Sequence, residues 1–370
     1  MTSASVLVNH WAMLESQLTR NLETFRAVAE LSRLTFLQRT IANRTEDLRQ
    51  QIRDARELRD SHPDWNTVTR IRNEVSGLHG ECLSIMQGVA AAKSGIGNPI
   101  CAVAQGLVTE LSGKANVQDE HLVLLGQRNS FTDLSEVIRF DCVDGSVAAL
   151  PIVAHEWGHY WARRWLEVFP APREPYAVWA AKYDKHIPAD HLNELFADFV
   201  GVFTIGAGFA YSCIFLHLLP TMAASQTHPS AKTRAAWILG LLKHTDPGRG
   251  RFLKGVWEDC AEERLDEAGS TYFDAADELL YSTRQTKRDL EFKTFGRAFR
   301  IQDQHALRTP DNIDLEDVTF VDLVNAYWLI REKQLGDPLL RQRAETTCGS
   351  LCARLAMLRG LLRGERWQTA

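Results

Sequence analysis

The pentapeptide His155–His159, with the sequence H-E-W-G-H, has the residue types and spacing of a metal-binding helix. On an α-helix, residues four apart share one face, so His155 and His159 can direct their imidazoles at one point. Two imidazoles in this arrangement can bind zinc, and Glu156 is placed to take a proton from a metal-bound water. Pro151 favours a helix here, because proline is well accepted in a first helical turn. The segment therefore predicts a zinc site with a general base.

Two histidines do not complete a zinc site, and Glu194 is the best candidate for the third ligand. The segment Pro188-Ala189-Asp190 predicts a helix start with Asp190 as N-cap, which places Glu194 in the first turns. Asp198 lies one turn later on the same face, where a carboxylate can accept a hydrogen bond from a ligating histidine. The alternative is that these acids only stabilise the helix dipole, which explains Asp198 less well because an apolar run follows it.

His228 and Arg234 form a third element, T-H-P-S-A-K-T-R. Pro229 can open a helix that carries Arg234. During hydrolysis at zinc, negative charge builds on the substrate's carbonyl oxygen, and His228 could stabilise it. Arg234 could orient that donor or bind a carboxylate or carbonyl group of the substrate. A histidine followed by proline is common in loops and indicates little alone. This element supports a catalytic site because it follows the other two elements in the sequence.

Together, H-E-x-x-H, E-x-x-x-D and H-P-x-x-x-x-R resemble the gluzincin metallopeptidases, nearest to the family of the CAAX prenyl endopeptidase and the membrane heat-shock protease. The resemblance covers roughly residues 120 to 245. It implies His155, His159 and Glu194 as zinc ligands, Glu156 as general base and His228 as a donor to the transition state. The gap from His159 to Glu194 is shorter than is typical of that family, and is similar to that of small cytosolic zincins that cleave repressors. Flanking transmembrane helices are not evident.

Two segments before the metal-binding helix, 121–125 and 136–140, predict strands. An extended peptide can pair with the edge of a sheet, where the strand reads its backbone and pockets read alternate side chains. We expect the second strand to supply such a substrate-binding edge, made of Val137, Ile138, Arg139 and Phe140.

Helical patterns flank this segment on both sides. Apolar residues spaced by three and four recur through residues 4–60 and 65–82, which predicts a helical hairpin or a coiled-coil-like arm. Such an arm could pack within the chain, self-associate or dock a regulatory partner. Further helices are predicted at roughly residues 252–268, 271–300, 314–335 and 338–364.

The expected fold is α+β and predominantly α-helical, with a zincin-like catalytic core and a small sheet flanked by helical segments. The expected domains are an N-terminal helical segment (residues 1–115), the core (116–248) and a C-terminal helical segment (249–370).

The segment Phe199–Leu219 contains no Asp, Glu, Lys or Arg and is long enough to span a bilayer. Its glycines and hydroxyl side chains dilute the apolar pattern, and Glu194 and Asp198 tie its start to the metal site. We favour a continuous helix in the core of a soluble domain over a membrane segment.

Composition and charge bear on which class of partner the protein binds and on the cellular compartment in which it works. A formal net charge of -5 argues against nucleic acid as the main partner. The seven cysteines are odd in number and scattered, which suits free thiols in a reducing compartment. The first residues have neither the basic start nor the apolar run of a signal peptide. We therefore expect a cytoplasmic protein.

The expected function is zinc-dependent hydrolysis of peptide bonds in a protein or peptide substrate, regulated or narrow in specificity. The alternative is a helical scaffold or binding protein whose zinc is structural or vestigial. A closed site with four protein ligands would favour the scaffold, and an open position would favour the enzyme. Zinc suits two histidines and one carboxylate, although this ligand set alone does not exclude other divalent ions.

Overall fold

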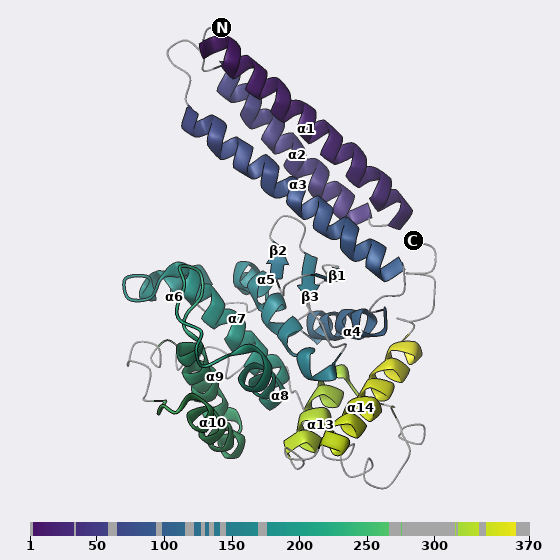
Figure 1. Ribbon diagram of the computed structural model, residues 1–370, viewed down its shortest axis with the longest axis vertical. Helices are drawn as coiled ribbons and strands as arrows, with labels where there is room; N and C mark the ends of the chain where they lie inside the picture. The colour runs from purple at the N-terminus through teal and green to yellow at the C-terminus, as the bar shows by residue number, and fades with distance from the viewer. Residues whose placement is uncertain are drawn as a thin grey trace.

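In the computed structural model the chain is predominantly helical and contains one small sheet (Figure 1). The structure describes residues 3–32, 35–57, 65–93, 98–114, 122–126, 130–132, 137–140, 146–168, 176–265, 275, 315, 317–332 and 338–359. The prediction of a mostly helical chain with a small sheet is confirmed.

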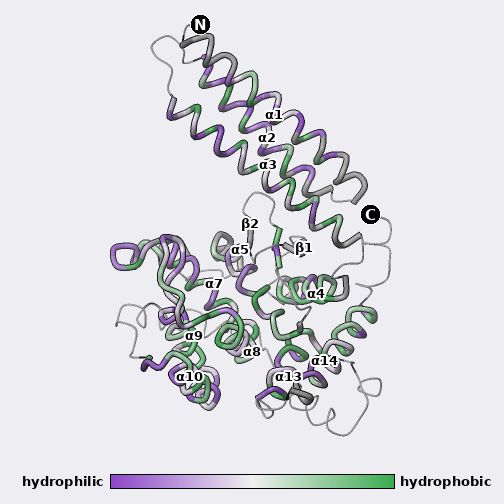
Figure 2. The backbone as a smooth tube through the Cα atoms, in the orientation of Figure 1, coloured by the Kyte–Doolittle hydropathy of each residue, from purple (hydrophilic) through white to green (hydrophobic). Residues whose placement is uncertain are grey.

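The N-terminal residues form an arm of three long helices that projects from the rest of the molecule (Figure 1). These are α1 (Ser3–Ser32), α2 (Thr35–Glu57) and α3 (Trp65–Lys93). Hydrophilic and hydrophobic residues alternate along all three helices (Figure 2), because each turns one apolar face inward. These faces form their own apolar cluster, which also takes in Leu124 and Val137 from the sheet.

The sheet has three short strands in the order β1-β3-β2. Strand β1 (Leu122–Leu125) is parallel to β3 (Val137–Phe140), and β2 (Ser130–Thr132) is antiparallel to β3. The predicted substrate edge is therefore wrong: Val137, Ile138, Arg139 and Phe140 form the central strand, paired on both sides. Because the neighbouring strands occupy both of its hydrogen-bonding edges, β3 has no edge left for a peptide.

Around the sheet, the remaining helices share a second, larger apolar cluster. It includes residues of α4 (Asn98–Lys114), η1 (Val147–Ala149), α5 (Ile152–Val168), α6 (Tyr176–Tyr183), α7 (Ala189–Ile205), α8 (Ala207–Ser212), η2 (Cys213–His217), α9 (Ala231–Thr245), α10 (Pro247–Ala261), α13 (Phe320–Glu332) and α14 (Pro338–Leu358). The predicted division at residues 115 and 248 stays a prediction, but the described C-terminal helices pack into the same cluster as α5 and α7.

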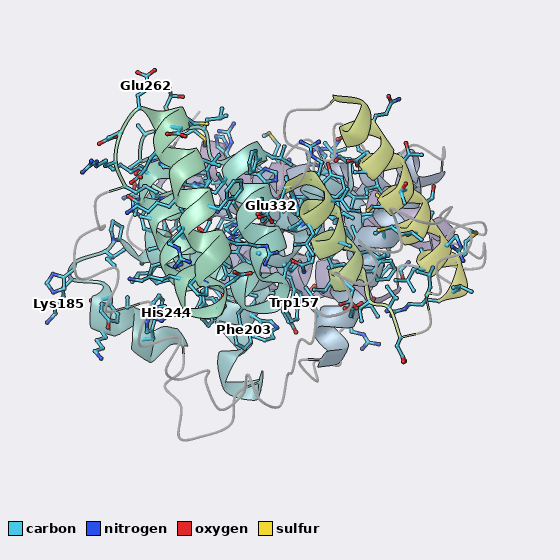
Figure 3. The ribbon with its side chains drawn as sticks, turned by 90° about the horizontal axis from the view of Figure 1, so that it is seen from below. Trp157, Lys185, Phe203, His244, Glu262 and Glu332 are labelled. Carbon is cyan, nitrogen blue, oxygen red and sulfur yellow. The ribbon has the colours of Figure 1, made fainter. Side chains whose placement is uncertain are left out.

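Polar contacts tie the C-terminal helices to the centre. Glu332 of α13 accepts from Arg249 Nε of α10 at 3.2 Å, and Figure 3 shows Glu332 in the interior between these helices, whereas Lys185 and Glu262 project outward. Glu345 of α14 accepts from the backbone nitrogen of Val147 at 2.7 Å. The helix predicted at 271–300 lies outside the described residues except for Ala275.

The segment Phe199–Leu219 is not one continuous helix, contrary to our expectation. Helix α7 ends at Ile205, and Gly206 has φ 77°, ψ -137°, before α8 begins at Ala207. The segment then ends in a π-helical turn, in which Leu218 N donates to Cys213 O at 2.8 Å. Most of its apolar side chains up to Cys213 are buried. None of the described helices is long and apolar enough to cross a membrane.

Helices α5 and α7 approach each other closely at Gly158. A Cβ atom at this position would lie 2.8 Å from the Cα of Ala197 and 3.1 Å from the Cβ of Val200. Contact with backbone cannot be relieved by rotating a side chain, so only glycine allows this separation of the two helices. The fourth residue of H-E-W-G-H therefore sets the distance between α5 and α7.

Replacing Gly158 with alanine should force α5 and α7 apart and lower the free energy of unfolding by about 1–3 kcal/mol, as overpacking of a core does. Gly255 of α10 is the matched control, because a Cβ there meets nothing within 4 Å. Gly255→Ala should instead stabilise the chain by about 0.5–1 kcal/mol through helix propensity. Urea unfolding of both variants measures the difference. Equal effects of the two substitutions would contradict the close contact.

Candidate metal centre

Helix α5 presents two histidines on one face and two tryptophans on another. The rings of His155 and His159 are 4.8 Å apart between centroids and nearly perpendicular. Trp157 and Trp161 are buried in the apolar cluster, with ring centroids 4.6 Å apart. The tryptophans hold α5 against the core, so that the histidine face is fixed toward α7.

Glu194 of α7 faces both imidazoles. Its Oε2 lies 3.4 Å from His155 Nε2, and its Oε1 lies 3.4 Å from His159 Nε2. One ligand atom from each of the three residues lies within 4.8 Å of the other two. Tetrahedral zinc with bonds of about 2.0–2.1 Å has ligand atoms roughly 3.4 Å apart. The cluster could therefore hold a metal ion with only small adjustments.

Asp198 and Arg234 support the cluster from behind. Asp198 is fully buried, and its Oδ1 accepts a hydrogen bond from His155 Nδ1 at 2.9 Å. Arg234 of α9 donates to both oxygens of this carboxylate, from Nε to Oδ2 at 2.8 Å and from Nη2 to Oδ1 at 2.6 Å. With Nδ1–H engaged in this way, Nε2 of His155 is the ring nitrogen left available to a metal ion.

His228 lies at the exposed side of the cluster. Its Nε2 is 3.5 Å from Glu194 Oε1, and 56% of its side chain is exposed. Within its loop, the backbone nitrogen of His228 donates to Ser225 Oγ at 3.0 Å, and Thr227 Oγ1 contacts its Nδ1 at 2.8 Å. Ser230 then caps α9 by accepting from Thr233 N. The structure thus brings His228 beside the three possible ligands while leaving it open to solvent.

His191 fixes this loop to α7, a role for which the sequence contains no motif. Its Nε2 lies 2.9 Å from the carbonyl oxygen of Ser225, and because a carbonyl can only accept, Nε2 donates. The only signal in the sequence is its spacing, since a residue three positions before Glu194 lies on the same helix face. His191 thereby holds the segment that carries His228.

Phe209, also unmarked by any motif, covers the other side of the cluster. Its ring is stacked with that of His155, with centroids 6.5 Å apart and an interplanar angle of 10°.

Glu156 is 5% exposed and follows His155 on α5, roughly 100° further around the helix.

The start of α7 differs slightly from expectation: Pro188, not Asp190, is the N-cap, and Asp190 lies in the first turn.

The charges of the cluster balance one another. Burial alone would raise the pKa of Glu194, but His155, His159 and Arg234 outweigh it and lower this pKa. Burial likewise opposes the lowered pKa of Asp198, which Arg234 and His155 maintain. For His155, burial is outweighed by Asp198 and Glu194, which raise its pKa to about 10. Burial and the charge of His155 lower the pKa of His159 to about 4. Two carboxylates thus face one arginine and one protonated imidazole.

One buried oxygen indicates that a cation fits here. Glu194 Oε2 is inaccessible to solvent and accepts no hydrogen bond from any residue that the structure describes. A buried carboxylate oxygen without a hydrogen bond is unfavourable. Arg234 Nη1, 3.6 Å away, compensates its charge without hydrogen bonding to it, so an ion held between the imidazoles and the carboxylate would satisfy this oxygen directly. Two imidazole nitrogens and one carboxylate, with Asp198 behind one imidazole, form a donor set that suits a divalent ion.

Comparisons of the chain with protein-family models, with curated proteins and with solved structures found no match.

Replacing Glu194 with alanine should abolish metal binding, because it removes one of three ligands. Asp190→Ala is the matched control: this acid is exposed, on the same helix and four residues earlier. Elemental analysis of protein prepared without chelators should find about one metal ion per chain in the wild type and in Asp190→Ala, and none in Glu194→Ala. Retention of the metal by Glu194→Ala would contradict the ligand set.

Metal binding near pH 7 should release about one proton per ion from the protein's ligands. His155 carries this proton in the metal-free cluster because its pKa is raised to about 10, whereas His159, with a pKa of about 4, is already neutral. The affinity for the metal ion should therefore rise with pH until the pH reaches the raised pKa of His155. Calorimetry in buffers of different ionisation enthalpy counts the protons. Binding without proton release would show that His155 is neutral before the metal arrives.

Proposed function

We propose that the chain is a zinc-dependent endopeptidase of the gluzincin type. The observation that carries this proposal is the cluster of His155, His159 and Glu194 on two closely packed helices, with Asp198 behind one imidazole. Two histidines and a glutamate form a ligand set of catalytic rather than structural zinc, because three protein ligands leave one position open. The buried Glu194 Oε2, which accepts no hydrogen bond from any described residue, supports occupation by a cation.

Zinc in such a site supplies a Lewis acid that makes water a nucleophile at neutral pH and polarises a carbonyl group. Glu156 acts as the general base: its carboxylate takes the proton from the attacking water and returns it to the leaving amine. Its place directly after His155, on the helix that carries both candidate histidine ligands, supports this role.

His228 acts on the substrate's carbonyl oxygen. As negative charge builds on that oxygen, the imidazole donates a hydrogen bond to it. The position of His228 beside Glu194 and its large exposure support this role, because the side chain can reach a substrate that arrives from solvent. The hydrogen bonds of His228 with Ser225 and Thr227, and the anchor at His191, hold the loop in place before the substrate binds.

Arg234 and Asp198 orient His155 and do not touch the substrate in this scheme. The two parallel hydrogen bonds from Arg234 fix the Asp198 carboxylate in one plane, which in turn fixes the imidazole of His155. Such supporting groups commonly contribute about 10–100-fold to metal affinity or activity.

The substrate in this proposal is a protein or peptide, and the specificity is narrow. An extended peptide that adds to the sheet must pair with β1 or β2, because among the described strands these two form the edges. Strand β2 packs against α5, which favours it as the edge nearer the catalytic helix. The three-helix arm offers a separate surface for a substrate or regulatory partner.

Glu156→Gln should retain about one zinc per chain and lose roughly 10²–10⁴-fold in peptide hydrolysis, the contribution typical of a general base. The amide keeps the size of the side chain but cannot take the proton. Glu23→Gln, an exposed position on α1, is the control and should match the wild type in both measurements. Cleavage is measured by mass spectrometry on a peptide library derived from a whole proteome, together with zinc content.

Full activity of Glu156→Gln with zinc bound would contradict this mechanism. Zinc binding by the wild type without cleavage of any peptide or protein would favour the helical scaffold with a structural metal. Cleavage of very few peptides, with casein left intact, would support a regulated protease of narrow specificity.

A further inference from the structure

The break after the ligand helix α7 is capped by a residue from a distant part of the chain. At Gly206 the backbone enters the left-handed half of φ space, and the helix cannot continue. Asn325 of α13 donates from Nδ2 to the carbonyl oxygen of Ile205 at 2.9 Å. Its Oδ1 accepts from the backbone nitrogen of Gly208 at 3.0 Å. One amide side chain therefore satisfies a backbone group on each side of the break.

Asn325 suits this place because the break needs a donor and an acceptor at once. The side chain is 2% exposed, so water cannot replace it. Aspartate would keep the acceptor for Gly208 but would face the carbonyl of Ile205 with a negative oxygen. Leucine would keep the size and lose both hydrogen bonds to the break, as well as the one to Val321. The second amide hydrogen donates to Val321 O at 3.0 Å, which fixes the rotamer.

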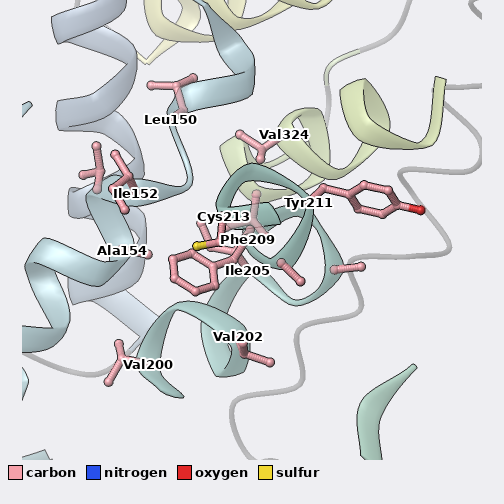
Figure 4. Packing of buried hydrophobic residues seen from close by; sticks show 14 of the residues in the cluster. Leu150, Ile152, Ala154, Val200, Val202, Ile205, Phe209, Tyr211, Cys213 and Val324 are labelled. Carbon is pink, nitrogen blue, oxygen red and sulfur yellow. The ribbon is translucent and has the colours of Figure 1, made fainter. Parts of the chain in front are cut away.

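The break in turn places Phe209 on the metal cluster. Its ring lies over Gly201 of α7, where even a Cβ atom would meet the ring at 2.5 Å. The same ring is stacked with His155 at 6.5 Å between centroids. Figure 4 shows Phe209 and Ile205 in one packed group with Val324, the neighbour of Asn325 on α13. A chain of contacts therefore leads from α13 through the break to the ring of a metal ligand.

We propose that Asn325 is a positioning residue of the metal centre. By capping the break after Ile205, it seats Phe209 against His155, and Phe209 keeps water from that side of the imidazole. This inference rests on the proposed metal site. It implies that α13, through Asn325, helps to fix the geometry of that site. Loss of the cap frees α8, so Phe209 leaves the ring of His155 and the metal is held less tightly.

The test compares zinc affinity in Asn325→Leu and Asn325→Asp with that in Leu323→Ala. Leu323 is fully buried on the same helix but two residues away, on the opposite side from Asn325, so its truncation destabilises α13 without touching the break. Competition with a chromophoric chelator gives the zinc dissociation constant, and thermal unfolding of the metal-free chain gives the stability. Both Asn325 variants should weaken zinc binding by about 10–100-fold. Leu323→Ala should lower the melting temperature comparably and leave the zinc constant nearly unchanged.

A double-mutant cycle identifies the path of the effect. Phe209→Leu should weaken zinc binding with Asn325 intact, and adding Asn325→Asp to it should cause little further loss, because both act through the same contact. If Asn325→Leu does not fold, Asn325→Asp carries the comparison, since it keeps the hydrogen bond from Gly208.

Additive losses in the cycle, or an equal loss of zinc affinity in Leu323→Ala, would overturn the positioning role. A wild-type chain that binds no zinc would overturn both this inference and the proposed function. The expected shift in affinity in a chain that cleaves no peptide would support the inference while refuting the peptidase.

Discussion

The close approach of α5 to α7 is the constraint on which the metal cluster depends. On α5, Gly158 lies between the two histidines in sequence, and on α7, Ala197 lies between Glu194 and Asp198. Each ligand helix thus carries a small residue among its polar ones, and the two small residues meet with no room for another methyl group. The burial of Trp157 and Trp161 in the core and the break after α7 can position the site only when this contact is made. Without it, the imidazoles and the carboxylate could not share one ion, because coordination tolerates shifts of only tenths of an ångström.

Close packing brings charges together that would otherwise repel or remain unsolvated. Asp198 and Glu194 are two buried carboxylates one helical turn apart, and Arg234 is the cation that reaches both, at 2.6 Å and 3.6 Å. Breaking such a buried group by removing one member is far more damaging than replacing the whole, since it leaves an uncompensated charge. The arginine therefore makes a carboxylate-rich interior tolerable, and together with the protonated His155 it balances the two carboxylates.

Most residues of the candidate metal centre could be predicted because short spacings in the sequence determine which of them share a helix face. Two histidines four apart define a face, an acid in the first turns of a later helix provides a partner, and Asp198 lies one turn further on. The structure places His155, His159, Glu194, Asp198, His228 and Arg234 together as expected.

What could not be predicted depends on contacts between distant segments. Strand β2 is only three residues long, too short for an alternating pattern, so β3 was expected at an edge. The uncharged run after Asp198 has the composition of one helix, and its break at Gly206 is stabilised by Asn325. Glycine alone does not mark a helix end, and no residue near Gly206 in the sequence indicates that Asn325 caps the break. The roles of His191 and Phe209 could not be predicted for the same reason, since each contacts a loop or ring outside any motif; His191 was expected to be a surface or packing residue.

The two apolar clusters have a consequence for the order in which the chain acquires structure during synthesis. The three-helix arm closes its cluster from the first 89 residues, apart from two strand residues, so it can form while the rest is still being made. The cap on the ligand helix comes 120 positions after Ile205. The ribosome must therefore release α13 before α7, α8 and Phe209 can settle. A nascent chain can therefore carry a folded arm well before the helices around His155, His159 and Glu194 reach their final packing.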